Sequence, residues 1–168
     1  MRHVRIRSEA GSQNKVRTPG SNGLWCRLEI PSSLSLVQEV EDKIISQCRG
    51  YSYTDRDLFA LKLAIEEALT NAVKHGNKND PEKHVRVKYR ITLQRADVVV
   101  EDEGTGFNPA SLPDCTCHEN LCTPHGRGIL LMRAFMNSVV YNSTGNSVTL
   151  TKFNDAPPHT SACHVAFG

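Results

Sequence analysis

The stretch from residue 66 to residue 76 reads EEALTNAVKHG and combines apolar residues at helical spacing with a row of polar residues. Apolar residues recur at helical spacing before and within this stretch, at Leu58, Leu61, Ile65, Ala68, Leu69 and Ala72. The pattern predicts a helix that begins at Thr54 or Asp55. The same helix is predicted to run through Lys74 and to be closed by Gly76.

Polar residues of this stretch form a row on the predicted helix. At about 100° per residue, Glu67, Asn71 and Lys74 fall within about 60° of one another, opposite the apolar face. A carboxylate, a carboxamide and an ammonium group in one row can provide a base, a ligand for a hard cation and a contact for phosphate. A solvated helix face with ordinary side-chain pairing explains the same spacing.

A second motif lies at residues 98–107, which read VVVEDEGTGF, an apolar strand running into an acidic, glycine-rich turn. A buried Asp102 at the end of this strand can accept a hydrogen bond from an exocyclic amine. Gly104 and Gly106 permit positive φ and let a planar ring approach the backbone. Taken alone, an Asp-x-Gly-x-Gly sequence is equally typical of an ordinary turn.

A third motif lies at residues 125–132, which read HGRGILLM, a glycine pair that opens an apolar helix. The helix is predicted from about Gly128 to Met136. Backbone N–H groups at a helix N-terminus form a site for phosphate oxygens. Glycines also occur at helix boundaries for backbone reasons, so the significance comes from the three motifs occurring in this order and spacing.

Together, the three motifs resemble the N, G1 and G2 boxes of the GHKL ATPase superfamily, which has the Bergerat ATP-binding fold. Within that superfamily, the short single domain and the wording Glu-Ala-x-Thr-Asn-Ala most resemble anti-sigma-factor serine kinases. The resemblance covers residues 24–153, which is nearly all of the predicted globular part.

The resemblance implies a site for ATP and Mg²⁺. It implies that Asn71 coordinates Mg²⁺, that Asp102 accepts a hydrogen bond from the adenine amino group, and that Glu67 is the general base. The other implied contacts are Gly104 and Gly106 at the adenine, and Lys74, Gly126, Arg127 and Gly128 at the phosphates. A glutamate of ordinary pKa is a weak base, which suffices because phosphoryl transfer demands mainly positioning and charge neutralisation.

Periodicity outside the motifs predicts the remaining elements. Strands are predicted over residues 24–30, 84–91, 98–100, 139–142 and 147–153, and a further helix over about 33–49. Grouped helices and hairpin-like strands predict an α+β fold, a two-layer sandwich with a mixed, mainly antiparallel sheet and helices on one face. The predicted organisation is a disordered basic arm (1–22), the ATP-binding domain (23–154, lid about 108–125) and a flexible tail (155–168).

The predicted lid also carries five residues of the kind that bind zinc, namely Cys115, Cys117, His118, Cys122 and His125. Four of them could surround Zn²⁺ tetrahedrally. Against a zinc site, the segment has no Cys-x-x-Cys pair, and the adjacency of Cys117 and His118 strains a common tetrahedron. A lid without zinc is therefore the favoured interpretation.

Composition limits the partners and the compartment. A net charge of +2 on 168 residues is too small to indicate a nucleic-acid partner. No apolar run approaches the roughly 18 residues needed to span a bilayer, and no secretory signal follows the basic start. We therefore expect a cytoplasmic protein with reduced cysteines and no membrane partner.

For function, the resemblance implies an ATP-dependent serine/threonine protein kinase that also acts as an anti-sigma factor. Its implied partners are a sigma factor and an anti-anti-sigma antagonist whose serine it phosphorylates, and relatives commonly form homodimers. One alternative is the catalytic module of a histidine kinase, which is disfavoured because the helix predicted at 33–49 contains no histidine. Another is a nucleotide-dependent binding switch without catalysis, which is disfavoured because all the motif residues are present.

Overall fold

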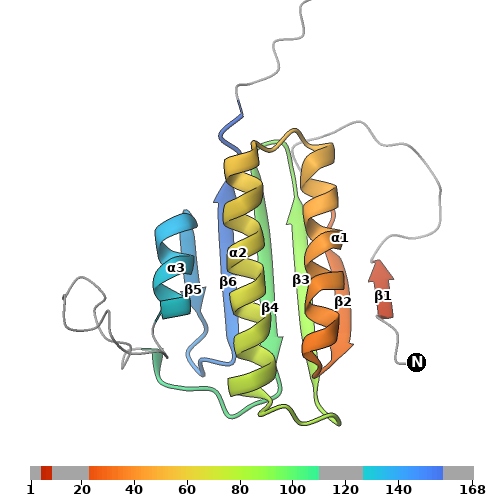
Figure 1. The fold of residues 1–168 in the computed structure, drawn as a ribbon, viewed down its shortest axis with the longest axis vertical. Coiled ribbons are helices and arrows are strands. Elements are labelled where there is room, and N and C mark those ends of the chain that lie inside the picture. Colours follow the sequence, from red (N-terminus) through yellow and green to blue (C-terminus); the bar gives the residue numbers. More distant parts are fainter. Residues whose placement is uncertain (1–4, 9–22, 110–126, 157–168) are drawn as a thin grey trace, which may run out of the picture.

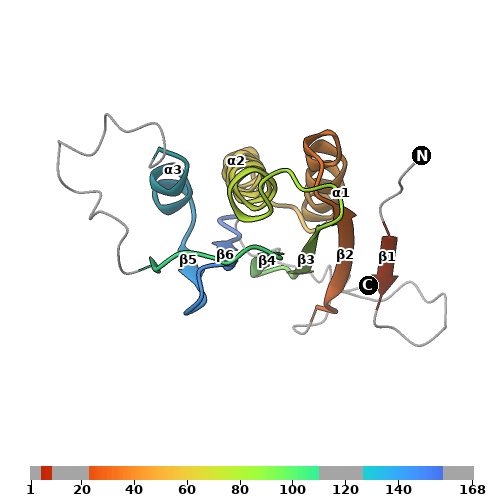
Figure 2. The same cartoon turned by 90° about the horizontal axis from the view of Figure 1, so that it is seen from below.

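The computed structural model describes residues 5–8, 23–109 and 127–156. Within them, three α-helices cover one face of a six-stranded sheet, which gives two layers (Figure 1, Figure 2). The predicted two-layer α+β sandwich is confirmed. All pairings between the described strands are antiparallel, so the sheet is not mixed in this part of the chain.

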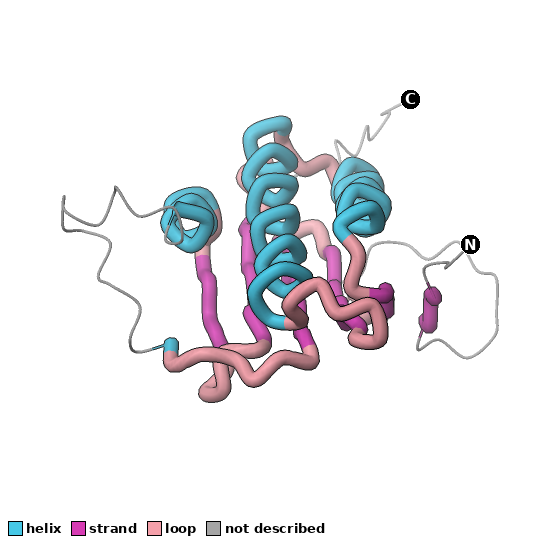
Figure 3. The backbone as a smooth tube through the Cα atoms, turned by 60° about the horizontal axis from the view of Figure 1, so that its bottom comes forward, coloured by secondary structure: helices cyan, strands magenta, loops and turns pink. Residues whose placement is uncertain are grey.

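The sheet has the strand order β1-β2-β3-β4-β6-β5. The strands are β1 (Arg5–Ser8), β2 (Cys26–Pro31), β3 (His84–Ile91), β4 (Arg95–Asp102), β5 (Ser138–Tyr141) and β6 (Ser147–Phe153). The helices are α1 (Val37–Gly50), α2 (Asp55–Asn71) and α3 (Arg127–Phe135), with a 3-10 turn η1 (Leu34–Leu36) and a π turn η2 (Ala72–Gly76). Figure 3 separates these helices, strands and loops by colour. None of the described helices is long and apolar enough to cross a membrane.

Strand β1 departs from the sequence-based prediction. Its residues lie in the segment 1–22 that composition predicts to be a disordered arm, yet they pair with β2 from Arg5 opposite Glu29 to Ser8 opposite Cys26. The strands and helices that the sequence does predict are all found, with boundaries that differ by a few residues.

The core lies between the helical layer and the sheet. Strand β3 alternates clearly, because Val85, Val87 and Tyr89 are each at most 1% exposed while the residues between them face the other side. The helical layer contributes the apolar face of α2 (Leu61, Ala64, Ile65, Ala68 and Leu69). These side chains fix α2 across the middle of the sheet, over β4 and β6 (Figure 1).

Helix α2 begins where the sequence predicts. Thr54 is its N-cap, and its hydroxyl accepts a hydrogen bond from the Asp57 N–H at 3.2 Å. The Asp57 carboxylate in turn accepts from the Thr54 N–H at 3.3 Å, which completes a capping box.

The other end of α2 differs from the prediction. The α-helix ends at Asn71 and continues as a π turn through Gly76, so Lys74 does not belong to the α-helical row with Glu67 and Asn71. In this turn the Asn77 N–H donates to the Ala72 carbonyl at 2.8 Å. A π turn accommodates one extra residue, which shifts every following side chain by about one position around the helix.

A buried ionic cluster holds the beginning of α2 to the end of β6. Asp57 is fully buried, and its carboxylate lies 2.8 Å from the Lys152 ammonium, which also contacts Asp155 at 2.9 Å. The Asp155 N–H donates to Asp57 at 3.1 Å. Asp155 therefore belongs to the folded domain, although the sequence-based boundary places it in the flexible tail.

The face of the sheet opposite the helices carries charged side chains. Arg86 lies among three carboxylates, with nitrogen–oxygen distances of 3.5 Å to Glu29, 3.6 Å to Glu101 and 2.5 Å to Glu103. At the other end of β3, the Arg90 guanidinium lies 5.0 Å from the centre of the Trp25 ring.

Candidate nucleotide-binding site

A pocket of about 280 Å³ lies at the end of α2. Its walls come from α2 and the π turn, from β4 and the turn after it, from α3, and from β5, β6 and the turn between them. The lining residues are Ala68, Asn71, Ala72, His75, Gly76, Val100, Asp102, Thr105, Gly106, Phe107, Ile129, Tyr141, Gly145, Asn146, Ser147 and Val148. The fold thus brings all three sequence motifs to one cavity.

Three of the predicted site residues, Asn71, Asp102 and Gly106, line this pocket. Gly106 has φ +70°, and a Cβ there would overlap the backbone carbonyl of Thr144. The left-handed conformation and the close approach both require glycine at this position. Gly104 lies beside the pocket, and its N–H donates to Asp102 Oδ1 at 2.8 Å.

The Asp102 carboxylate is partly buried at the end of β4. Burial raises its pKa, an effect that the Gly104 N–H and Lys83 reduce and that Glu101 reinforces. A Cβ on Gly76 would overlap this carboxyl group, so the π turn approaches Asp102 closely only because residue 76 is a glycine. A partly buried carboxylate at a pocket wall is a strong acceptor for a ligand N–H group.

Glu67 lies beside the pocket, against the first turn of α3. A Cβ on Gly128 would overlap Glu67 Oε2, so the two residues meet without intervening atoms. The N-terminal end of a helix favours a nearby carboxylate, because its unpaired N–H groups carry partial positive charge. The structure therefore brings the predicted base, Glu67, next to the predicted phosphate-binding helix. Glu67 lies one turn of α2 before Asn71.

The π turn decides which side chain after Asn71 reaches the pocket. Both Lys74 and His75 are exposed, but only His75 lines the pocket wall. The contact between Lys74 and phosphate therefore stays a prediction. Arg127 begins α3, but its side chain, Gly126 and the five cysteine and histidine residues of the predicted lid lie outside the described residues.

The three motifs do not predict that apolar side chains form much of the pocket wall. Val100, Ile129 and Val148 line the cavity, and the rings of Phe107 and Tyr141 meet edge to face with centroids 5.1 Å apart. Burial raises the pKa of Tyr141 to about 12, although Arg133 opposes the shift, so its ring is neutral at physiological pH. Apolar walls with a few polar groups are typical of pockets for planar heterocycles.

The turn between β5 and β6 closes one side of the pocket. Gly145 has φ +74°, and a Cβ there would overlap the Phe107 carbonyl. Asn146 follows it, and its carbonyl accepts from the Asp102 N–H at 3.0 Å. The Asn-Ser-Thr-Gly-Asn sequence indicates a turn, but nothing local in it predicts that the turn packs against Asp102.

The residues present fit a magnesium ion bound together with a nucleotide. Among the described residues no group of three or more histidine, cysteine or acidic side chains is placed to hold a metal ion. Mg²⁺ at nucleotide sites needs no such group, because it keeps several waters and binds one or two protein oxygens plus phosphates. The Asn71 carboxamide on the pocket wall meets that requirement.

Comparison with known proteins places this pocket in a family. Residues 30–152 match the family model described as the histidine kinase-like ATPase domain, a span that contains every predicted site residue. The chain belongs to this family. The resemblance to the GHKL superfamily is thereby confirmed, and with it the coarse assignment to ATPase-like kinases, which use ATP.

Individual members of the histidine kinase-like ATPase family support a narrower placement. The chain is 28% identical to the serine-protein kinase RsbW of Bacillus subtilis over 79% of its length and 88% of that protein. It is 34% identical to RsbW of Bacillus licheniformis, covering 65% of this chain and 71% of the relative. A solved structure of the RsbU and RsbW domains of Rv1364c from Mycobacterium tuberculosis shares the fold, with a TM-score of 0.51 at 16% identity, over 76% of this chain and 32% of that longer chain.

Proposed function

We propose that this protein is an ATP-dependent serine/threonine protein kinase that also acts as an anti-sigma factor in the cytoplasm. The observation that carries the proposal is the position of Glu67, one helical turn from Asn71 and against the N-terminal turn of α3, beside a pocket that ends at Asp102. The relatives from Bacillus subtilis and Bacillus licheniformis are also named serine-protein kinases.

In this proposal the adenine ring lies between the apolar walls, and its amino group donates to the Asp102 carboxylate. The phosphates extend toward Asn71 and the beginning of α3, where Gly126, Arg127 and Gly128 contact them. Bound Mg²⁺, held by Asn71, would neutralise phosphate charge. Gly104 and Gly106 let the ring approach the backbone.

The proposed transfer joins the γ-phosphorus to a serine hydroxyl of a protein substrate. The new bond forms between the serine oxygen and phosphorus, the bond from phosphorus to the β–γ bridging oxygen breaks, and ADP leaves. Glu67 accepts the hydroxyl proton. Because phosphoryl transfer depends chiefly on positioning and charge neutralisation, a carboxylate of ordinary basicity is adequate for this role.

The proposed partners are a sigma factor, which the protein sequesters, and an anti-anti-sigma antagonist, whose serine it phosphorylates. Phosphorylation of the antagonist would leave the sigma factor bound, and a dephosphorylated antagonist would release it. The proposal includes a homodimer and a lid over residues 108–125 that covers the nucleotide.

A comparison of two adjacent glutamates tests the proposed catalysis. Glu67→Gln and Glu66→Gln remove the same charge, but Glu66 is exposed and Glu67 abuts α3. We expect both variants to bind Mg-ATP like the parent, and Glu67→Gln alone to slow phosphate transfer to a cognate antagonist by about 10²–10⁴-fold, the usual range for general base catalysis.

Three other outcomes would contradict parts of the proposed function. Transfer by Glu67→Gln at the parental rate would remove Glu67 as the base. ATP binding by the parent without transfer to any antagonist would favour the non-catalytic switch. Failure of the parent to bind ATP or ADP at millimolar concentration would contradict the proposed function as a whole.

A further inference from the structure

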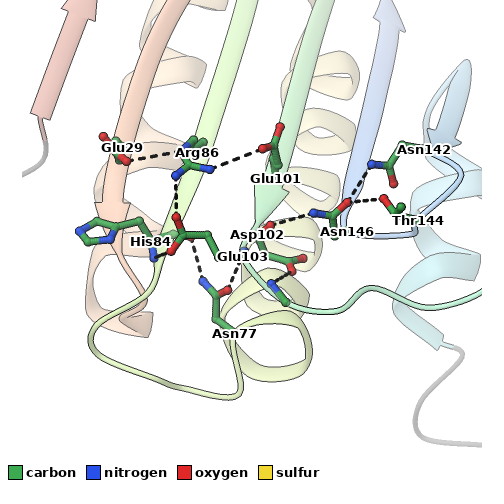
Figure 4. Close-up of polar contacts among 11 residues, drawn as sticks. Glu29, Asn77, His84, Arg86, Glu101, Asp102, Glu103, Asn142, Thr144 and Asn146 are labelled. Carbon is green, nitrogen blue, oxygen red and sulfur yellow. Dashed lines mark hydrogen bonds and ion pairs between the residues drawn. The ribbon is translucent and has the colours of Figure 1, made fainter.

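The peptide group between Asp102 and Glu103 is held from both sides by asparagine side chains (Figure 4). On one side, the Glu103 N–H donates to Asn77 Oδ1 at 2.8 Å. On the other side, Asn146 Nδ2 donates to the Asp102 carbonyl oxygen at 3.1 Å. Asn77 follows the π turn and Asn146 is the last residue of the β5–β6 turn, so two distant segments meet at one peptide bond.

Each asparagine is itself fixed in orientation. Asn77 is fully buried, and its Nδ2 donates to the His84 carbonyl at 2.9 Å, so its oxygen must face Glu103. Asn146 Oδ1 accepts from Asn142 Nδ2 at 2.8 Å and from Thr144 Oγ1 at 2.6 Å, so its amide nitrogen must face Asp102. Rotating either carboxamide by 180° would replace these hydrogen bonds with unfavourable contacts between like groups.

The held peptide fixes the direction of the Asp102 side chain. Its plane is determined by ψ of Asp102 and φ of Glu103, and the Asp102 N–H is also bonded, to the Asn146 carbonyl at 3.0 Å. With its backbone fixed, the carboxylate is placed by the Gly104 N–H, 2.8 Å from Oδ1, and by the space that Gly76 leaves.

We propose that Asn77 and Asn146 are positioning residues for nucleotide selectivity. They hold the peptide so that the Asp102 carboxylate faces the exocyclic amine of the base. This inference rests on the proposed function, in which the pocket binds adenine. It assigns selectivity for the amine to a pair of residues outside the three sequence motifs.

The test compares ATP with purine riboside triphosphate, which carries hydrogen in place of the amino group. The ratio of the two affinities isolates the hydrogen bond to the amine, because every other ligand group is the same. A residue that only stabilises the fold would change both affinities equally and leave the ratio unchanged. Calorimetry of the full chain with each nucleotide measures the ratio.

Four variants complete the experiment. Asn146→Asp keeps the two hydrogen bonds accepted by Oδ1 and removes the donor to Asp102, and Asn77→Ala removes the opposite contact. Asp102→Asn gives the reference for loss of the carboxylate charge, since a carboxamide oxygen remains in its place. Asn137→Ala is the matched control, since the exposed Asn137 also accepts a backbone N–H, that of Phe153 at 2.8 Å, away from the pocket.

We expect the parent to prefer ATP by about 10- to 100-fold, the range for a hydrogen bond to a charged group. Asn146→Asp and Asn77→Ala should reduce this preference at least about fivefold, toward that of Asp102→Asn, and Asn137→Ala should keep it. If buried Asn77 cannot be replaced without unfolding, Asn146→Asp alone gives the answer.

Three results would overturn the inference in distinguishable ways. A parental preference retained in Asn146→Asp would show that the two asparagines do not orient Asp102. A parent that binds ATP without preference would show that Asp102 does not read the amine. A parent that binds neither nucleotide would remove the proposed function, and the inference with it.

Discussion

The position of the Asp102 carboxylate favours ligand binding at the expense of folding stability. Burial raises its pKa, which means that the folded protein holds the proton more tightly than the unfolded chain does. The sign of the linkage follows, because the contribution of Asp102 to stability falls as pH rises from its ordinary value through the raised one. The charged form of Asp102 therefore costs folding stability, and a bound amine donor would offset that cost.

Gly76 permits a close approach that a single methyl group would prevent. We expect Gly76→Ala to weaken ATP binding by at least about tenfold, because its Cβ would displace the Asp102 carboxylate and with it a charge-assisted hydrogen bond. Nucleotide titration by calorimetry measures the effect. The residue has no positive φ, so backbone strain does not contribute.

Gly50→Ala is the control for this substitution. Gly50 is the last residue of α1, and a Cβ there would meet no atom within 4 Å. Alanine should therefore leave ATP affinity unchanged and raise stability by up to about 1 kcal/mol. Equal ATP affinity in both alanine variants would contradict the role given to Gly76.

At the scale of single elements, α2 shows what sequence can and cannot predict. Its beginning is predictable, because Thr54 and Asp57 form the capping box within four consecutive residues. Its end is not, because the π turn leads into Asn77, whose partners His84 and Glu103 lie 7 and 26 residues further along the chain, outside the helix. A period of 3.6 residues applied through Lys74 therefore misplaces every side chain after Asn71.

The π turn allows a test that separates two adjacent residues. We expect His75→Ala, which removes a side chain from the pocket wall, to weaken ATP binding by about 3- to 10-fold, as for a lost hydrogen bond or packing contact. Lys74→Ala should change affinity less, because Lys74 does not line the pocket wall. Competition with a fluorescent nucleotide measures both. A larger loss in Lys74→Ala would support the phosphate contact implied by the family resemblance instead.

At the scale of the whole molecule, the sequence predicts layers and motifs better than edges and walls. The pocket walls at Phe107, Tyr141 and Val148 come from three segments whose proximity depends on the order of β4, β6 and β5. The composition of residues 1–22 does not predict strand β1, because basic and polar residues, with glycine and proline, predominate there. Only pairing with the free edge of β2 makes those four residues a strand.

The Asp57–Lys152 pair joins the beginning of α2 to the end of the sheet. Burial alone would raise the pKa of Asp57, but hydrogen bonds from Lys152, Thr54 and the Asp155 N–H outweigh it and lower the pKa to about 2. A depressed pKa contributes stability above the ordinary value near 4, and this contribution is lost as pH falls toward 2.

We expect Lys152→Met to destabilise the protein by about 3–5 kcal/mol at pH 7, because it leaves a buried carboxylate unpaired. The variant should become more stable as pH falls, where the parent becomes less stable, because an unpaired buried carboxylate favours its protonated form. Urea denaturation between pH 4 and pH 7 measures both effects. Lys88→Met, at an exposed position of β3, should change neither, and a Lys152→Met variant as stable as the parent would exclude the structural role.

The contact between Trp25 and Arg90 makes intrinsic tryptophan fluorescence a probe of one face of the sheet. Trp25 is the single tryptophan of the chain, and its ring lies under a guanidinium group on the sheet face opposite the helices. The residues that line the nucleotide pocket do not include it, so ATP has no direct access to the fluorophore. Tryptophan emission that changes with a protein partner but not with nucleotide would therefore locate that partner on the face of the sheet opposite the helices.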